Sequence, residues 1–559
     1  MEFLDRKFFR SKDFWIYLFI FLFSLFLLRY LFCPGIYTAH DIWHNLARLN
    51  YYFQALKEGQ FPPYYLSNAA SGFGYPLFLF SYHLPWIFGS IFMFFGLSDV
   101  SVIKILFFLS FFLSGVTMYL LAFELSRRRY LSLVSSFLYL IAPYRFLIIF
   151  VSAAVGISFT FIFIPLIALG LLRIQKGRLL DGELLMAFGL SGVILSHFPT
   201  LIAFLPSFFF LFLYFLFKSK FKIKFLKTIL FSVFLSLGIS SFYLFPAFYY
   251  ENYILGLPRI FEMGFVNLSQ LIYSKWGFGI IVKSASENPF SFQIGIAQWL
   301  IFLFSLLVVV LGLLRSFKFD SLVLFLILAF LINIFFTNHS SSLFWEKFIS
   351  KTGLDFPFRF IYPNVFLTSL LFVLLAKEVK SKVFYYIFPF LILFVAFYTN
   401  RNHIRPNMFL AENEFRPFIK SELTTNKYSE YFPKGASLFS IDNKLKERII
   451  NESQISLVSE SINSSKYKIL FDEEKSILLP KFNYPFVSVL VDGVYVKQDL
   501  KSQPFLKVVV PKSSHEIEVI FKRTLVINVS LLTTLISLSL FSFLIWKSAK
   551  VKDPQFKSC

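Results

Sequence analysis

The sequence predicts a polytopic α-helical membrane protein with about twelve transmembrane helices, amphipathic juxtamembrane helices and a small, mostly-β extracytoplasmic domain near the C-terminus. Of the 559 residues, 57% are hydrophobic, 83 are Phe and only 15% are charged, which is typical of a membrane protein. The net charge of +22 is carried by short Lys and Arg clusters between apolar runs, not by one basic face. This pattern follows the positive-inside rule and argues against nucleic acid as a partner.

Twelve apolar runs are long enough to cross a hydrocarbon core about 30 Å thick, which needs roughly 20 helical residues. They begin near Phe14, Val102, Leu131, Ile157, Leu184, Leu201, Thr228, Trp299, Ser321, Phe360, Val383 and Leu525. A further apolar stretch, Leu77 to Phe95, contains Pro85 and follows Pro76. If it crossed, six later basic clusters would lie on the side opposite the basic N-terminus, which the positive-inside rule disfavours. We therefore interpret it as a juxtamembrane or re-entrant segment in the outer leaflet.

This topology places both termini in the cytoplasm and the long, chemically varied loops outside the plasma (inner) membrane. The chain divides into a transmembrane domain (1–399), an extracytoplasmic domain (400–523) and a final transmembrane helix with a basic cytoplasmic tail (524–559). The outer loops of the first domain are 33–101, 249–298 and 337–359. The inner loops are short and basic, so the chemistry is expected on the outer face.

The second half of the 400–523 segment alternates apolar and polar residues. Strands are predicted at Phe486–Leu490, Val494–Lys497, Leu506–Val510 and Glu516–Phe521, with a hairpin turn at Asp492-Gly493. The pattern favours a small β-sandwich. A carbohydrate-binding module and a structural lid are the two roles left open.

The first outer loop contains a predicted surface helix from Thr38 to Lys57. An apolar stripe at helical spacing is expected to face the membrane surface, and it consists of Ile42, Leu46, Leu49, Phe53 and Leu56. Asp41, His44 and Arg48, at i, i+3 and i+7, project together from the other side of the helix. An acid, an imidazole and a guanidinium therefore converge just above the membrane.

Two other interpretations of this helix compete with a functional one. Thr38 and Asp41 fit a capping box, in which Asp41 only completes the first helical turn. The run from His40 to His44 also imitates the HExxH pattern of zinc proteases, but Asp replaces the general-base Glu and no third ligand follows.

Several short motifs give the chain a resemblance to bacterial GT-C superfamily glycosyltransferase-like proteins, in particular the YfhO-type proteins and the 6-pyruvoyl-tetrahydropterin synthase-related membrane proteins. An acid on the first outer helix is followed by Gly59-Gln60-Phe61-Pro62-Pro63 and Gly74-Tyr75-Pro76-Leu77. Supporting motifs are Ala142-Pro143-Tyr144-Arg145, Ser196-His197-Phe198-Pro199-Thr200, Trp276-Gly277-Phe278-Gly279, Ser291-Phe292-Gln293-Ile294-Gly295 and Phe356-Pro357-Phe358-Arg359-Phe360. The pterin-related name implies no pterin chemistry.

The resemblance implies transfer of a sugar from a polyprenyl-phosphate-linked donor to a glycan, lipid or protein acceptor on the outer face. Asp41 matches the acid that acts as catalytic base or metal ligand in that superfamily, with His44 beside it. Cations can stabilise the departing phosphate, and Arg is suited to bidentate phosphate contacts. The candidate substrate-binding residues are Arg48, His83, Arg145, His197 and Arg359.

One departure from the family pattern leaves the metal question open. Relatives often carry a second acid in the next outer turn, but Val151 to Gly156 contains none. His83, His197 or Glu251 could take its place, or the protein could have lost metal dependence or catalysis. A divalent metal ion, if bound, would use Asp41, His40 and His44; no other cofactor is predicted.

Two alternatives to a glycosyltransferase follow from the sequence. Twelve spans also suit a transporter or flippase of lipid-linked glycans, although few ionisable residues lie near the midplanes of the predicted spans. A non-catalytic envelope scaffold with the same fold is the other alternative, and the missing second acid supports it.

Overall fold

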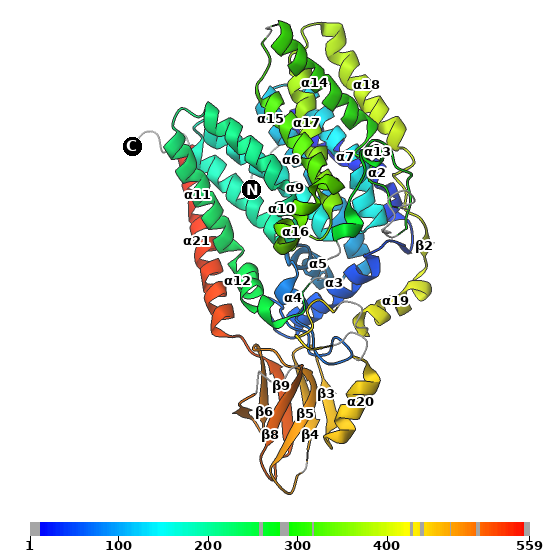
Figure 1. Cartoon of the computed structure of the whole chain (residues 1–559), viewed down its shortest axis with the longest axis vertical. Helices are drawn as coiled ribbons and strands as arrows, with labels where there is room; N and C mark the ends of the chain where they lie inside the picture. Colours follow the sequence, from blue (N-terminus) through cyan, green and yellow to red (C-terminus); the bar gives the residue numbers. More distant parts are fainter. Residues whose placement is uncertain are drawn as a thin grey trace.

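The computed structural model describes residues 12–256, 261–279, 290–315, 318–424, 429–436, 441–469, 471–498 and 504–552. A bundle of apolar helices forms most of the molecule, and a small β domain projects from one end (Figure 1). The last helix, α21, runs from the β domain back along the bundle, where it packs against α12 and α11 (Figure 1).

The long helices of the bundle are α2 (Lys12–Leu27), α6 (Asp99–Ser126), α7 (Arg129–Ile141), α9 (Val155–Gln175), α10 (Leu179–Lys218), α11 (Lys222–Ile239), α14 (Ile296–Arg315), α15 (Leu322–Thr337), α17 (Ile361–Lys377), α18 (Lys382–Asn400) and α21 (Leu525–Lys552). Shorter helices connect them: α3 (Ile42–Lys57), α4 (Leu77–Phe80), α5 (Leu84–Phe94), α8 (Pro143–Phe146), α12 (Ser241–Tyr250), α13 (Leu268–Ile272), α16 (Ser342–Lys347) and the 3₁₀ turn η9 (Pro357–Phe360). Towards the β domain lie α19 (Glu412–Thr424) and α20 (Asn443–Glu452).

Within the described residues, seven helices are long and apolar enough to cross a membrane, or up to ten if each of three bent pairs is one span. The predicted count of twelve is therefore not confirmed. The first predicted span corresponds to α2, which has only 16 residues. The predicted runs at Leu184 and Leu201 both fall inside α10.

Helix α10 is not one straight rod. A straight helix of its 40 residues would be about 60 Å long, yet the carbonyl of Lys218 at its end lies 3.4 Å from the side-chain amide of Gln175, four residues before its start. The backbone leaves helical geometry at His197 (φ −169°, ψ 92°). The chain therefore reverses at His197, and both ends of α10 lie beside the end of α9.

The apolar face of α3 is covered by protein, which corrects the prediction that it faces the membrane surface. Ile42, Leu46 and Leu49 are fully buried, because α3 packs against α5, α6 and α19. The segment from Leu77 to Phe95 forms the short helices α4 and α5, of 4 and 11 residues. Neither is long enough for a span of roughly 20 residues.

The β domain consists of two antiparallel sheets whose buried side chains share one core. The five-stranded sheet has the order β3-β4-β9-β6-β7 and the two-stranded sheet pairs β5 with β8. The strands are β3 (Ser456–Glu460), β4 (Ser464–Lys468), β5 (Lys475–Phe482), β6 (Val487–Val491), β7 (Val494–Val496), β8 (Phe505–Val510) and β9 (Glu516–Phe521). The predicted strands and their hairpin turn are confirmed: Asp492 (φ 47°) and Gly493 (φ 80°) are both left-handed, as a type I′ turn requires.

The β domain contacts the predicted first outer loop (33–101) through a buried cation. Lys481 is fully buried; its ammonium donates a hydrogen bond to the backbone carbonyl of Ser67 (2.8 Å) and forms an ion pair with Glu460 (3.0 Å). Lys446 of α20 lies 3.1 Å from the same carboxylate. A two-residue ladder, β1 (Ile36–Tyr37) with β2 (Phe409–Leu410), adds a second connection between the first outer loop and the segment before α19.

Candidate functional site

Helix α3 begins directly after Asp41, which occupies the N-cap position but makes no capping hydrogen bond with its side chain. The capping-box interpretation is therefore wrong: Thr38 lies outside the helix and the Asp41 carboxylate is not used to complete it. The backbone amides of His40 and Asp41 instead donate to the carbonyls of Val151 (2.9 Å) and Ser152 (3.0 Å). The acid-free turn after α8 is thus the segment that lies directly against Asp41.

Asp41 lies in a strongly charged environment. Burial raises the pKa of Asp41, and the nearby carboxylate of Asp355 acts in the same direction. The positive charges of Arg48, of protonated His40 and of Arg359 oppose this rise without cancelling it. A carboxyl group with a raised pKa is a better proton acceptor than an ordinary Asp, and two guanidinium groups beside it can bind an anion.

Arg359 is held by Asp355, four residues earlier in its own segment, and by His197 of α10. Its Nη2 atom donates a hydrogen bond to one carboxylate oxygen of Asp355 (2.7 Å), and its Nε atom lies 2.5 Å from the other oxygen in an ion-pair contact that lacks hydrogen-bond geometry. Its third nitrogen, Nη1, lies 3.2 Å from Nε2 of His197, the residue at which α10 reverses. The imidazole Nδ1 lies 2.9 Å from the hydroxyl of Thr200. Arg359 is therefore oriented by contacts on both sides.

Arg48 approaches Asp41 from one side of α3 and contacts the α4–α5 segment on the other. Its Nη1 lies 3.4 Å from the hydroxyl of Ser81, and its guanidinium carbon lies 6.0 Å from the ring centre of Tyr82. Glu430, which follows α19, is close enough for Arg48 to lower its pKa, although burial has the larger effect and the net pKa of Glu430 is raised. Arg48 thus lies near two acids that are far apart in the sequence.

Gly156 marks the point at which three of these segments meet. A Cβ atom on Gly156 would lie 2.5 Å from the backbone carbonyl of Ser196 and 2.7 Å from the ring of Tyr82. Such separations are shorter than real contacts allow, so only glycine fits here. Tyr82, His197 and the turn beside Asp41 are consequently packed into one site.

The structure brings together Asp41, Arg48, Arg359 and His197 from the predicted set. His40 lies beside them, with its Nε2 atom 3.2 Å from the carbonyl of Phe278. His44 follows on the first turn of α3 and is partly exposed.

His83 and Arg145 are not part of this cluster. His83 is fully buried among aromatic rings, and its Nδ1 lies 3.0 Å from the hydroxyl of Tyr52. Arg145 is 1% exposed; it donates to the hydroxyl of Ser114 (2.8 Å) and lies over the ring of Phe161 (4.0 Å). Both side chains have the surroundings of packed core residues.

Sequence reasoning missed two acids of the site. Asp355 precedes Arg359 by four residues, and this spacing of opposite charges was the available signal. Glu430 lies in a short polar stretch that carries no motif. Glu251, a predicted substitute for the missing acid, is exposed in the 3₁₀ turn η4 (Glu251–Tyr253).

The described residues do not fit a metal centre at this position. Over the described ranges, no group of three or more His, Cys, Asp and Glu side chains is placed to hold a metal ion. The acid that acts on Asp41 electrostatically, Asp355, is already paired with the guanidinium of Arg359.

No family model matches the chain, so the resemblance to the YfhO-type proteins stays a prediction. A protein of Lactococcus lactis subsp. cremoris (strain MG1363), described as uncharacterized, is 29% identical over 268 residues, which is 46% of this chain. The match spans 43% of that relative, less than half of its length. Among solved structures, the oligosaccharyltransferase AglB from the archaeon Archaeoglobus fulgidus, in complex with an inhibitory peptide and a dolichol-phosphate, aligns with 70% of this chain and 56% of its own. That alignment has 12% identity and a TM-score of 0.41.

Proposed function

We propose that the protein is a membrane glycosyltransferase of GT-C type, which transfers a sugar from a polyprenyl-phosphate-linked donor to a cell-envelope acceptor on the outer face of the plasma membrane. The observation that carries this proposal is the Asp41 carboxyl, with a raised pKa, between Arg48 and Arg359. The motifs that resemble those of GT-C proteins support the same proposal.

In the proposed reaction, Asp41 accepts the proton of the acceptor hydroxyl as the oxygen forms a bond with the anomeric carbon of the sugar. The bond between that carbon and the donor phosphate oxygen breaks, and the phosphate leaves with the electron pair. Arg48 and Arg359 stabilise the charge on the departing phosphate, as preorganised cations do in a partly buried site. Asp355 and His197 are positioning residues that orient Arg359.

The other predicted site residues receive different roles. We assign His44 to the exposed side of the site, where it can exchange a proton between Asp41 and solvent. His83 and Arg145 are assigned to packing, because both are buried among aromatic rings. Membrane lipids surround the bundle in this proposal.

The direct test measures loss of radiolabelled polyprenyl-phosphate sugars and appearance of labelled product in membranes that contain the full-length protein. Asp41→Asn keeps the size of the side chain but removes the base, so turnover is expected to fall by roughly 100-fold or more. Glu251→Gln, which removes an exposed outer carboxylate, serves as the matched control and is expected to have no effect. Undiminished transfer by Asp41→Asn would exclude Asp41 as the base.

A second candidate function, a scaffold that binds the lipid-linked sugar without turnover, is favoured by one observation. The turn that lies against Asp41, from Val151 to Gly156, contains no acid. In this case the donor would bind with equal affinity to the wild-type protein and to Asp41→Asn, and no labelled product would form with any acceptor.

A further inference from the structure

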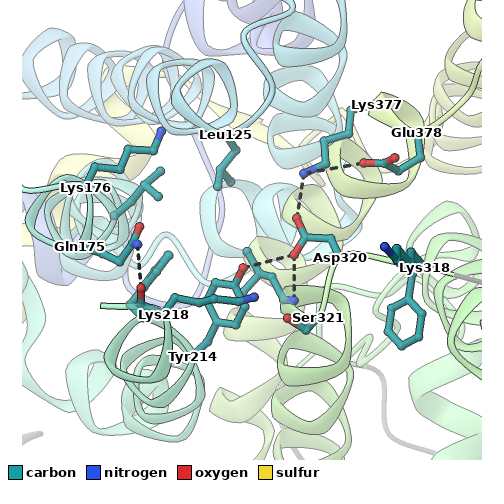
Figure 2. Close-up of a pocket in the computed structure, with 14 residues that line it drawn as sticks. Leu125, Gln175, Lys176, Tyr214, Lys218, Lys318, Asp320, Ser321, Lys377 and Glu378 are labelled. Atoms are coloured by element: carbon teal, nitrogen blue, oxygen red, sulfur yellow. Dashed lines mark hydrogen bonds and ion pairs between the residues drawn. The ribbon is translucent and has the colours of Figure 1, made fainter. Parts of the chain in front are cut away.

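A cavity of about 590 Å³ lies between helix ends of the bundle, and Figure 2 shows the residues that line it. It lies where the ends of α6, α9, α10 and α17 meet the start of α15. Helix α21 shows which end of the bundle this is. It begins beside the β domain, and Ser548 near its other end donates a hydrogen bond to Asp181 at the start of α10 (3.0 Å), so the start of α10 lies away from the β domain. The cavity is therefore separate from the site around Asp41.

Four lysines from four different segments line this cavity. They are Lys176, Lys218, Lys318 and Lys377. Their segments are far apart in the sequence, and the reversal of α10 brings Lys218 back beside Lys176 and Gln175. Figure 2 shows them around Asp320 and Tyr214.

Two of the four positive charges are neutralised inside the protein. Lys377 forms an ion pair with Asp320 (2.8 Å), and the same carboxylate accepts hydrogen bonds from the hydroxyl of Tyr214 (3.2 Å) and from the amide of Leu322 (3.0 Å). Lys176 forms an ion pair with Glu124 (2.9 Å). The acceptor oxygens of Asp320 are consequently occupied.

Lys218 and Lys318 have no carboxylate partner in the part of the chain that the structure describes. Lys218 instead lies with its ammonium 6.0 Å from the ring centre of Tyr214. Glu378, the remaining acid on the wall, is exposed and lies 4.0 Å from Lys377. Two positive charges therefore face one cavity without a counter-charge among the described residues.

We infer that this cavity binds a phosphate-bearing anion, held by Lys218 and Lys318, at the face of the membrane opposite the site around Asp41. Its volume lies within the range of about 300–1,000 Å³ that is usual for small-ligand sites. Basic pockets between helices at a membrane surface bind anionic lipid head groups through such lysines. The phosphate belongs either to the head group of an anionic phospholipid or to a soluble phosphate ester. The inference does not depend on the proposed glycosyltransferase activity.

The test measures ligand binding to the purified full-length protein in neutral detergent at constant ionic strength. The probes are short-chain phosphatidylglycerol, short-chain phosphatidylcholine and glycerol phosphate. The variant Lys218→Gln/Lys318→Gln removes both unpaired charges of the cavity. Lys222→Gln/Lys224→Gln is the matched control, because it removes two exposed charges from the start of α11, outside the cavity wall.

Phosphatidylglycerol is expected to bind the wild-type protein and the control equally, and the Lys218→Gln/Lys318→Gln variant roughly 30-fold more weakly. Glycerol phosphate that binds as tightly, with the same loss in that variant, would identify a soluble ester as the ligand. Lys218→Arg/Lys318→Arg should retain binding, which separates loss of charge from misfolding. Equal weakening in both Gln variants, or equal binding of phosphatidylcholine, would overturn the inference.

Discussion

Asp355 accepts a hydrogen bond from Nη2 of Arg359 (2.7 Å) and forms an ion pair with this guanidinium, whose Nη1 atom lies 3.2 Å from Nε2 of His197. Both side chains are largely buried, with 12% of Arg359 and 19% of Asp355 exposed. Asp355 therefore orients an arginine that the proposed mechanism uses, although Asp355 itself takes no part in the proposed reaction.

Replacement of Asp355 should impair the reaction without removing a reacting group. Asp355→Asn weakens the pair with Arg359, so the guanidinium is no longer held in one orientation, and turnover should fall roughly tenfold to hundredfold. Donor turnover in membranes measures this effect. Asp355→Glu keeps the charge and should recover part of the activity. An Asp355→Asn protein with wild-type turnover would show that this pair is only structural.

The pH dependence of turnover should report the raised pKa of Asp41. A general base must be ionised, so activity should fall as the pH decreases through this pKa, which lies above the usual range for an Asp. Arg48 favours the ionised form and lowers the pKa of Asp41. In Arg48→Gln the acidic limb of the residual activity should therefore move to higher pH. A limb that stays in place or moves to lower pH would contradict the proposed charge relationship.

The ionised form of Asp41 should lower the free energy of unfolding. Because its folded-state pKa is raised, the folded protein binds more protons than the unfolded chain between the ordinary pKa and the raised one. Stability therefore falls as the pH rises through this window. Asp41→Asn, which mimics the neutral form, should melt at a temperature equal to or above that of the wild-type protein near neutral pH. A clearly lower melting temperature would mean that the ionised carboxylate is stabilising.

The buried lysine between the β domain and the first outer loop gives a second pH effect. Burial lowers the pKa of Lys481 to about 8, and Glu460 opposes this shift. Between about 8 and the ordinary lysine pKa of 10.5, the unfolded chain binds more protons than the folded one, so stability rises with pH in this window. The stability advantage of the wild-type protein over Lys481→Met should widen across it.

At neutral pH, Lys481→Met should destabilise the protein by about 2–4 kcal/mol, because it leaves Glu460 with one cation and the carbonyl of Ser67 without its donor. Thermal melts of the two proteins at a series of pH values test both effects. A stability difference that is independent of pH would exclude the titration of Lys481.

Gly156 offers a steric test of the site. In Gly156→Ala the new methyl group would collide with the carbonyl of Ser196 and the ring of Tyr82, so these segments must separate. We expect the variant to lose turnover and about 1–3 kcal/mol of stability. Equal activity of Gly156→Ala and the wild type would show that the packing here is loose.

The sequence predicted those parts of the site that depend on local spacing. Asp41 is the N-cap of α3 and Arg48 lies seven residues later on this helix, so helical periodicity alone predicted that the two side chains lie on the same side. The Asp492-Gly493 turn was similarly readable from two residues. His197 entered the prediction through a family motif.

The remainder depends on contacts between distant segments, which local patterns do not encode. The apolar stripe of α3 gave no sign that α5, α6 and α19 would cover it, because lipid and protein select the same apolar residues. Glu430 and Arg48 are far apart in the sequence, so no local pattern places these two charges near each other. His83 and Arg145 look functional in sequence, but the rings that enclose them come from other helices.

The reversal of α10 has a mechanical consequence for the site. His197 lies at the bend between the two halves of α10. The first half packs against α9, where Gly192 lies against the ring of Phe163. The second half packs against α15, where the side chain of Asn333 donates a hydrogen bond to Ser207 (3.0 Å). The angle between these segments sets the position of the imidazole and, through it, of Arg359. A change in the tilt between these helices would therefore displace the guanidinium of Arg359.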